Sequence, residues 1–350
     1  MNLQDFLGIE LPIIQAPMAG VQTSALAITV SNAGGLGSLP AAMLTLDTFR
    51  TELAAITSQT SRPYNVNFFC HTPPEPDSGR EARWRAALAP YYAEFGIDPA
   101  TVPTGGGRAP FSHEHADLLE AFKPPVVSFH FGLPPPELLQ RVKSWGAKVL
   151  SSATTVDEAR WLEANGADAV IAQGLEAGGH RGMFLSDDLS TQIGTMALLP
   201  QVLRAVRIPV IAAGGIADAN GVKAALALGA AGVQIGTSYL LCPEATTTAL
   251  HRAALVSSER AEHTALTNLI TGRPARGIFN RLMKELGPLS DAPPAFPLAT
   301  SALMPLKIAA EKLGRDDFST LWSGQNTTGC RNLPAAELTR ALAAIENHTP

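Results

Sequence analysis

The stretch PVIAAGGIADANGVKAALALGAAGVQIGT (209–237) contains the pattern on which the fold depends. A short apolar run, Pro209–Gly215, ends in two glycines, and a segment of helical composition, Asp218–Leu228, follows it and stops at Gly229. A second apolar run, Gly232–Thr237, comes next. Continuous apolar runs are typical of strands buried on both faces of a parallel sheet. Because Asp and Gly are typical helix boundaries, the stretch predicts a strand, a helix and another strand.

Six further apolar runs precede this stretch and bring the number of predicted strands to eight. They are Ile13–Met18, Leu36–Pro40, Asn65–Phe69, Val126–Gly132, Lys148–Ala153 and Ala169–Gly174. A second helical segment, Thr155–Asn165, lies between two of these runs and starts with a Thr that can cap it. Eight strands alternating with helices predict an α/β fold, a (β/α)8 TIM barrel. A doubly wound open sheet is the alternative, but no GxGxxG opens a helix after a strand.

The chain has 350 residues, whereas such a barrel commonly needs about 250, which leaves room for a smaller second domain. We expect the barrel in residues 1–239, with an insertion, 70–125, whose long loops lie near the active site. Residues 240–325 are expected to form a smaller, mainly helical second domain or lid. Residues 326–350 are expected to form a C-terminal helix that returns to the barrel.

Composition excludes several classes of protein. A net charge of −5, without runs of like charge, argues against a nucleic-acid surface. The chain has neither a secretory signal pattern nor about 20 predominantly apolar residues in a row, so no membrane span is expected. Cys70, Cys242 and Cys330 are far apart, and no HExxH motif occurs. We therefore expect reduced thiols, a cytoplasmic location and no metal.

Glycines and amides concentrate at the C-terminal ends of the predicted strands, where barrel enzymes have their active sites. The glycines of AAGGIAD (212–218) and QIGTSYL (234–240) precede helical segments. They favour a bound phosphate, although they could simply make tight turns. Asn67 and Gln173 carry amides that suit the donors and acceptors of a flavin ring, or that merely satisfy a loop backbone.

Two histidines follow predicted strands. His180, in GLEAGGHRG (174–182), can take a proton from a weak carbon acid because histidine titrates near neutrality; the alternative is a hydrogen-bonded structural residue. His130, in SFHFG (128–132), either forms a wall of the pocket or competes as the base. Glu176 is expected to orient the loop before His180 or to lie at the surface. The chain has no GxSxG and no Walker A motif, which excludes serine hydrolase and P-loop functions.

These motifs resemble one known family, the flavin-dependent nitronate monooxygenases, and most closely their class I type. The resemblance extends from residue 11 to about residue 330. The motifs that carry it are QAPMAG (15–20), NVNFF (65–69), SFHFG (128–132), AQGLEAGGHRG (172–182), AAGGIAD (212–218) and QIGTSYLLCPEA (234–245).

The resemblance implies a TIM barrel that holds FMN non-covalently, with His180 as the catalytic residue. The residues that it implies for FMN are Met18, Asn67, Gln173, Gly178, Gly215, Gln234, Ile235, Gly236 and Thr237. The implied partners are a small anionic nitronate, such as propionate 3-nitronate, and O₂, with a homodimer also expected. The implied products are an aldehyde or ketone and nitrite or nitrate.

The chain departs from the family pattern in its C-terminal part. PAFPLATSALMPLK (294–307) contains none of the tyrosines that the family often places over the pocket. Lys307 is a candidate partner for an anion, or a solvated side chain, and Gln325 is a further pocket candidate. Two alternative functions stay open. One is an FMN-dependent NAD(P)H oxidoreductase, reducing a quinone or an enoyl thioester, and the other is a non-catalytic flavin- or phosphate-binding protein.

Overall fold

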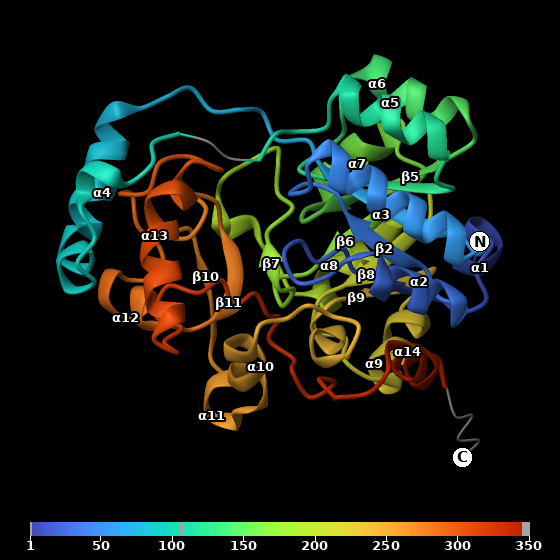
Figure 1. Cartoon of the computed structure of the whole chain (residues 1–350). Coiled ribbons are helices and arrows are strands. Elements are labelled where there is room, and N and C mark those ends of the chain that lie inside the picture. The colour runs from blue at the N-terminus through green and yellow to red at the C-terminus, as the bar shows by residue number, and fades with distance from the viewer. Residues whose placement is uncertain (1, 106–107, 345–350) are drawn as a thin grey trace.

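Eight parallel strands form a barrel in the computed structural model, which describes residues 2–105 and 108–344 (Figure 1). The last residues of the expected C-terminal helix, 345–350, and residues 106–107 of the insertion lie outside the described part. The strands are β1 (Ile13–Gln15), β2 (Gly37–Pro40), β3 (Tyr64–Phe69), β4 (Val126–His130), β5 (Lys148–Ala153), β6 (Ala169–Gln173), β8 (Val210–Ala213) and β9 (Gly232–Ile235). Every apolar run singled out in the sequence coincides with one of them, although β3 begins one residue before its run, at Tyr64. The expected TIM barrel is confirmed.

The barrel closes between its first two strands. The sheet order is β1-β9-β8-β6-β5-β4-β3-β2, so β1 and β2 are its two edges. An isolated parallel bridge joins Ile14 to Leu36 across them. The Gln15 N–H donates to the Leu36 carbonyl at 2.9 Å, and the Leu36 N–H donates to the Ile13 carbonyl at 2.9 Å. Closure leaves the two ends of the barrel as the places where a ligand can enter.

Helices cover the outside of the barrel. They are α2 (Ser24–Asn32), α3 (Leu46–Gln59), α5 (His113–Phe122), α6 (Pro136–Ser144), α7 (Val156–Ala164), α8 (Thr195–Ala205), α9 (Ala219–Ala227) and α14 (Ala335–Ala343). Thr155 caps α7 and Asp218 caps α9, each by accepting a hydrogen bond from a backbone N–H of the first turn. The C-terminal helix α14 packs between α2 and α9, so the chain returns to the barrel after the second domain.

A short N-terminal helix, α1 (Leu3–Leu7), closes the end of the barrel where the strands begin. Leu3 and Leu7 pack against apolar residues of several barrel strands, among them Ile14 and Ile211. Leu3 is fully buried, and a Cβ at Gly232 would come within 2.3 Å of its side chain. This end is filled with side chains, which leaves the C-terminal ends of the strands for a binding site.

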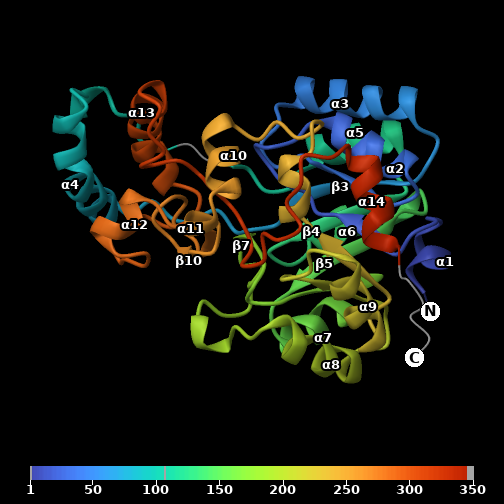
Figure 2. The same ribbon diagram turned by 90° about the horizontal axis from the view of Figure 1, so that it is seen from below.

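The second domain combines parts of the chain that are far apart in sequence. Its helices are α4 (Ser78–Glu94), α10 (Ala249–Val256), α11 (Ser258–Ala261), α12 (Arg281–Leu286) and α13 (Ala299–Lys312). The insertion supplies α4, which lies beside α13 in Figures 1 and 2. The Trp84 indole donates to the Ala299 carbonyl at 3.1 Å, and the Tyr92 hydroxyl donates to the Ala302 carbonyl at 2.7 Å. Helix α5, also in the insertion, packs against the barrel instead.

A small antiparallel sheet joins this domain to the barrel, a feature that the sequence analysis did not predict. Its strands are β10 (Thr264–Thr267), β11 (Ala275–Ile278) and β7 (Gly179–His180). The strand β7 belongs to the loop after β6 and pairs His180 with Ala275. The three strands have two to four residues each, too few for an alternating pattern to be recognised in the sequence.

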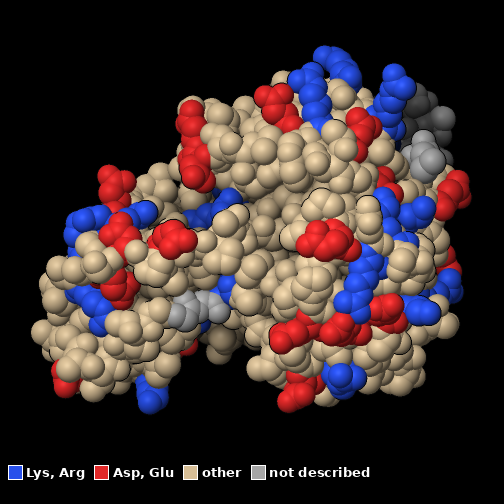
Figure 3. All heavy atoms as spheres, turned by 90° about the horizontal axis from the view of Figure 1, so that it is seen from above, with Lys and Arg blue, Asp and Glu red and all other residues tan. Residues whose placement is uncertain are grey.

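Two further observations bear on possible partners. In the part of the chain that the structure describes, no helix is long and apolar enough to cross a membrane. The face of the molecule seen in Figure 3 is hollowed between the two lobes, and acidic and basic side chains are interspersed over it. That face therefore offers no extended basic patch to a nucleic acid.

Candidate active site

A cavity of about 310 Å³ lies at the C-terminal ends of the barrel strands, where the barrel meets the second domain. It brings together all but one of the site residues suggested by the sequence: Met18, Asn67, His130, Gln173, Gly178, His180, Gly215, Gln234, Ile235, Gly236, Thr237 and Lys307. The exception is Gln325, which is exposed and does not line the cavity, whereas its neighbour Asn326 does.

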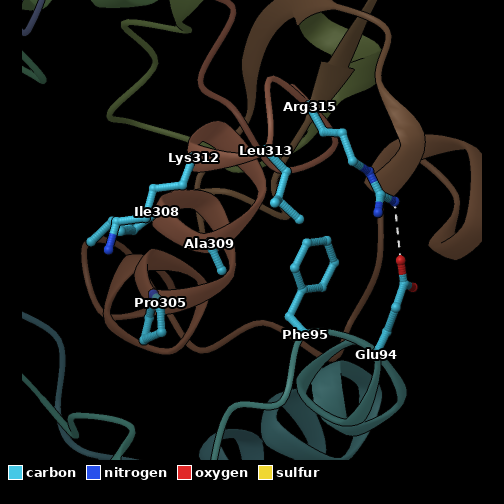
Figure 4. A pocket seen from close by; sticks show the side chains of 8 residues that line it. All are labelled: Glu94, Phe95, Pro305, Ile308, Ala309, Lys312, Leu313 and Arg315. Atoms are coloured by element: carbon cyan, nitrogen blue, oxygen red, sulfur yellow. Dashed lines mark hydrogen bonds and ion pairs between the residues drawn. The ribbon is translucent and has the colours of Figure 1, made fainter.

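A second cavity, of about 650 Å³, is wide open and lies between α4 and α13 (Figure 4). Phe95 points towards Leu313, and the ion pair between Glu94 and Arg315, at 3.0 Å, lies at one edge. Its lining includes none of the site residues suggested by the sequence. The inner cavity is therefore the candidate active site.

His180 lies in β7 and is surrounded by aromatic rings. The centroids of Phe69, Phe131, Phe296 and Trp322 lie between 5.2 and 6.1 Å from the centroid of its imidazole. Two of these rings come from the barrel and two from the C-terminal part of the chain. The surroundings exclude water from most of the imidazole, although the residue also lines the cavity.

The hydrogen bonds of Thr271 indicate which nitrogen of His180 carries the proton. The Thr271 hydroxyl lies 2.9 Å from His180 Nε2 and donates its single hydrogen to the Arg273 carbonyl at 3.3 Å. The hydroxyl then accepts from Nε2–H, which leaves Nδ1 unprotonated. Nδ1 has no hydrogen-bond partner among the described residues, so it is the nitrogen available to a ligand.

Burial keeps His130 and His180 neutral at pH 7. It lowers the pKa of His180 well below the usual range, and the charges of Arg108 and Arg273 act in the same direction. Burial also lowers the pKa of His130 to about 4. A neutral imidazole can accept a proton or a hydrogen bond at its free nitrogen.

Two side chains hold the backbone of β7 in place. His130 Nε2 donates to the His180 carbonyl at 3.2 Å, and its Nδ1 accepts from the Ser152 hydroxyl at 3.1 Å. The Gln173 amide donates to the same carbonyl at 3.0 Å and accepts from the Gly182 N–H at 2.7 Å. Both ring nitrogens of His130 are therefore engaged, whereas His180 keeps one nitrogen for a ligand.

Glu176 and Arg181 anchor the same loop from outside the cavity. The Glu176 carboxylate accepts from the backbone N–H and the hydroxyl of Thr195, at 2.9 and 2.8 Å, at the start of α8. The Arg181 guanidinium is fully buried and donates to the Gln173 carbonyl at 2.8 Å and to Gln192 Oε1 at 2.9 Å. Of the two roles expected for Glu176, these hydrogen bonds support the one in which it orients the loop before His180.

Two amides leave acceptor oxygens for the cavity. Asn67 donates through Nδ2 to the Ser128 hydroxyl at 2.9 Å and to the Ser128 carbonyl at 3.2 Å, so its Oδ1 stays available. Gln234 Oε1 is buried, and it has no hydrogen-bond partner among the described residues. An orphaned buried acceptor costs about 1–3 kcal/mol. A ligand with an N–H donor at this position, such as a flavin ring, would remove that cost.

Glycines and a C-terminal segment form the part of the rim that suits a phosphate. Gly214 and Gly215 have φ of 113° and 74°, which L side chains rarely adopt. The Asn326 amide donates to the Gly215 carbonyl at 2.9 Å, and the Gly324 N–H donates to the Thr237 hydroxyl at 2.9 Å. Residues 324–326 therefore fix both glycine-containing turns, and the donors and glycines of the cavity fit FMN.

Comparison with known proteins agrees with this geometry. A family model described as "Nitronate monooxygenase" matches residues 1–344. The chain is 44% identical over 339 residues to a nitronate monooxygenase of Pseudomonas aeruginosa, covering 96% of each sequence. The chain belongs to the nitronate monooxygenase family. The resemblance inferred from the motifs is confirmed, and the protein is an enzyme.

A solved structure extends the comparison to the whole fold. A nitroalkane oxidase from Streptomyces ansochromogenes is 42% identical, superposes with a TM-score of 0.89, and covers 98% of this chain and 96% of its own. A nitronate monooxygenase of Paraburkholderia phytofirmans is 43% identical, covering 97% of this chain and 93% of that sequence. The relatives thus bear two names, one for the oxidation of nitronates and one for that of nitroalkanes.

Sequence reasoning missed several residues that this member of the family brings to the cavity. Arg108 and Trp322 line it, and Thr271 binds His180. His251 also lines it and is only 2% exposed, and both of its ring nitrogens lack a partner among the described residues. All four lie in the insertion or the second domain, where no strand end marks a position as part of a site.

Proposed function

We propose that the enzyme uses FMN and O₂ to oxidise alkyl nitronates, propionate 3-nitronate among them, to an aldehyde or ketone with release of nitrite or nitrate. The observation that carries the proposal is the setting of His180. Its imidazole is neutral and is held by Thr271. The permanently positive guanidinium groups of Arg108 and Arg273 lie near enough to lower its pKa. Such a site favours a small anion over a cation.

The cavity offers FMN a partner for each of its parts. Asn67, Gln173 and Gln234 provide amides for the ring, with Met18 beside them. The turns at Gly214–Gly215 and at Gly236–Thr237 provide backbone N–H groups for the phosphate. The redox chemistry, which is electron transfer from the substrate and reaction with O₂, belongs to bound FMN.

His180 contributes the nitrogen that Thr271 leaves free. Nδ1 carries a lone pair, so it can take a proton from the carbon of a neutral nitroalkane or hold a proton that binds a nitro oxygen. A nitronate is already deprotonated at that carbon and needs no base. We therefore assign His180 to orienting the nitro oxygens of a nitronate, and to proton removal where a neutral nitroalkane is the substrate.

His130 has a different role in this proposal. One of its ring nitrogens binds the carbonyl of His180 and the other binds Ser152, so neither is free to act on a substrate. It is a positioning residue that fixes the strand carrying the catalytic histidine. Gln173 binds the same carbonyl and adds its amide to the flavin side of the cavity.

The test measures oxygen uptake by the purified flavoprotein on addition of propionate 3-nitronate, with nitrite and nitrate assayed at the end. We expect rapid uptake with release of these anions and no bleaching of the flavin by NADH without oxygen. His180→Asn should lower kcat/KM for a neutral nitroalkane by roughly 100-fold or more, the range typical of a residue that handles a proton, and kcat/KM for the nitronate by less, while the bound flavin is retained. Bleaching by NADH without oxygen uptake would instead favour the NAD(P)H oxidoreductase.

A further inference from the structure

Two side chains of permanent positive charge line the cavity within the described residues, and they differ in how they are neutralised. Lys307 lies 4.0 Å from Glu311, one helical turn away on α13, and Glu311 is the single carboxylate in the described lining. Arg108 forms no ion pair with any described residue, and its guanidinium donates no hydrogen bond to one. Lys307 thus has an internal counter-ion, whereas Arg108 has none.

The structure holds Arg108 firmly by its backbone. His71 is 5% exposed, and its Nε2 donates to the Arg108 carbonyl at 3.0 Å. Three residues further on, the Phe111 N–H donates to the Phe69 carbonyl at 2.8 Å, at the end of β3. The absence of a protein acceptor for the guanidinium therefore does not come from a loose backbone.

Phe296 lies close to both Arg108 and His180. The guanidinium carbon of Arg108 lies 5.8 Å from the centroid of Phe296, and the imidazole centroid of His180 lies 5.2 Å from it. A desolvated guanidinium with free donors is costly unless an anion completes it. An anion bound by Arg108 would therefore lie close to the catalytic histidine.

We propose that Arg108 forms the anion-binding site of the cavity and binds the two oxygens of the substrate's nitronate group. This inference rests on the proposed function. The nitronate carries its charge on two oxygens of a planar group, and guanidinium presents parallel N–H donors that match such a pair. A neutral nitroalkane has the same two oxygens without the charge, so Arg108 also selects the nitronate over the nitroalkane.

Nitrate is the probe that tests the site without turnover, because it is a planar anion with the same O–N–O arrangement. Calorimetric titration of the purified flavoprotein with nitrate should give saturable binding. Arg108→Met should raise the nitrate Kd by about 10- to 100-fold, as expected for loss of a charge-assisted hydrogen-bonded pair, and Arg108→Lys by less. Arg83→Met removes an exposed arginine of the same insertion and should leave the Kd unchanged. An equal Kd in the parent and in Arg108→Met, or no nitrate binding by the parent, overturns the proposal.

Kinetics then separate this proposal from the proposed function. In a parent enzyme that oxidises nitronates, Arg108→Met should raise KM for the nitronate by about 10- to 100-fold and change that for a neutral nitroalkane by less than about threefold. An unchanged KM for the nitronate contradicts the role of Arg108 alone. Nitrate binding that depends on Arg108 in a protein without nitronate oxidation supports the anion site and contradicts the proposed function. Circular dichroism of Arg108→Met and Arg108→Lys confirms that each variant is folded.

Discussion

The two sides of the cavity are built on different principles. The barrel rim, which consists of Gly178, Gly215, Gly236 and Thr237, acts largely through backbone geometry at the ends of rigid strands. The cap side, which consists of Arg108, Thr271, His251, Lys307 and Trp322, acts through side chains that come from the insertion and the second domain.

The difference indicates a division of labour between the two sides. Backbone N–H groups at the ends of strands hold a phosphate in a fixed place, and a cofactor that stays bound requires such a fixed place. Side chains on a separate domain can differ in charge and size without disturbing that phosphate site, and substrate selection requires such variation. Changes on the rim should therefore alter cofactor content, and changes on the cap side should alter turnover or stability at full cofactor content.

The largest effect is expected from Gly178→Ala on the barrel rim. A Cβ at Gly178 would lie 2.5 Å from the Gly324 nitrogen and 2.6 Å from the Ser323 carbonyl carbon, both of them backbone atoms. The variant must push residues 323–326 off the rim, and with them the hydrogen bonds to Thr237 and Gly215. We expect flavin affinity to fall by about 100-fold or more, measured as the flavin-to-protein ratio and the FMN Kd of reconstituted protein.

The substitution to compare with Gly178→Ala is Gly272→Ala on the cap side. Gly272 has φ of 88°, and a Cβ there would come within 2.1 Å of the Pro294 carbonyl oxygen. Gly272→Ala should disturb the neighbouring Thr271 and lower turnover while the folded protein keeps its flavin. Loss of flavin in both variants to the same extent would break the division between the two sides.

The second effect concerns acid stability and resides in His251. Burial lowers the pKa of His251 in the folded state to about 4, below the unfolded value of 6.5. Between these values the unfolded chain binds the additional proton, so the free energy of unfolding falls as pH drops from 7 to 5. His251 accounts for about 2 kcal/mol of that loss at pH 5.

His251→Leu should therefore flatten the pH dependence of stability. Denaturant titrations at pH 7 and pH 5 should give a loss smaller by about 2 kcal/mol in this variant than in the parent. His113→Leu, at an exposed position on α5, is the matched control and should keep the loss of the parent. An unchanged slope in His251→Leu would mean that the acid sensitivity lies outside the cap side.

The barrel rim could be predicted from the sequence because strand ends mark it. A buried parallel strand must be a continuous apolar run, and the residue after its last hydrogen bond is either a turn glycine or a polar group at the rim. Asn67, Gln173 and Gly215 were found in this way, and all of them line the cavity. Resemblance to a family added Gly178 and gave His180 a role that the spacing alone left open.

The cap side could not be predicted because no periodic pattern fixes its residues. Arg108 lies in a loop, and nothing local distinguishes it from a solvated arginine until the fold places it beside Phe296. Thr271 and Gln325 show two kinds of error in the prediction of the cap side: one residue was missed, and the other was selected although it does not line the cavity. Thr271 belongs to no motif and binds His180. Gln325, a pocket candidate of the sequence analysis, is exposed, and its backbone N–H donates to the Glu176 carbonyl at 2.9 Å.

A third effect, of about tenfold, is expected from Thr271→Val on the cap side. The variant keeps the shape of the side chain and removes the acceptor for His180 Nε2–H, so the imidazole loses its preferred tautomer. We expect kcat to fall by about tenfold, in line with one lost hydrogen bond, with unchanged flavin content. Thr271→Ser restores the hydroxyl and should recover most of the activity. Failure of Ser to rescue would assign the loss to packing instead of proton position.

The smallest effect tests whether side chains matter on the barrel rim at all. Asn326 donates one neutral hydrogen bond to the Gly215 carbonyl, and this carbonyl can also be reached by water because Asn326 is half-buried. Removal of such a bond typically costs about 0.5–1.5 kcal/mol, so Asn326→Ala should weaken FMN binding by about three- to tenfold. Stopped-flow measurement of flavin release should find the change in the dissociation rate, since the cradle itself is intact. If Asn326→Ala weakened FMN binding as much as Gly178→Ala, the rim would depend on its side chains, and the contrast with the cap side would fail.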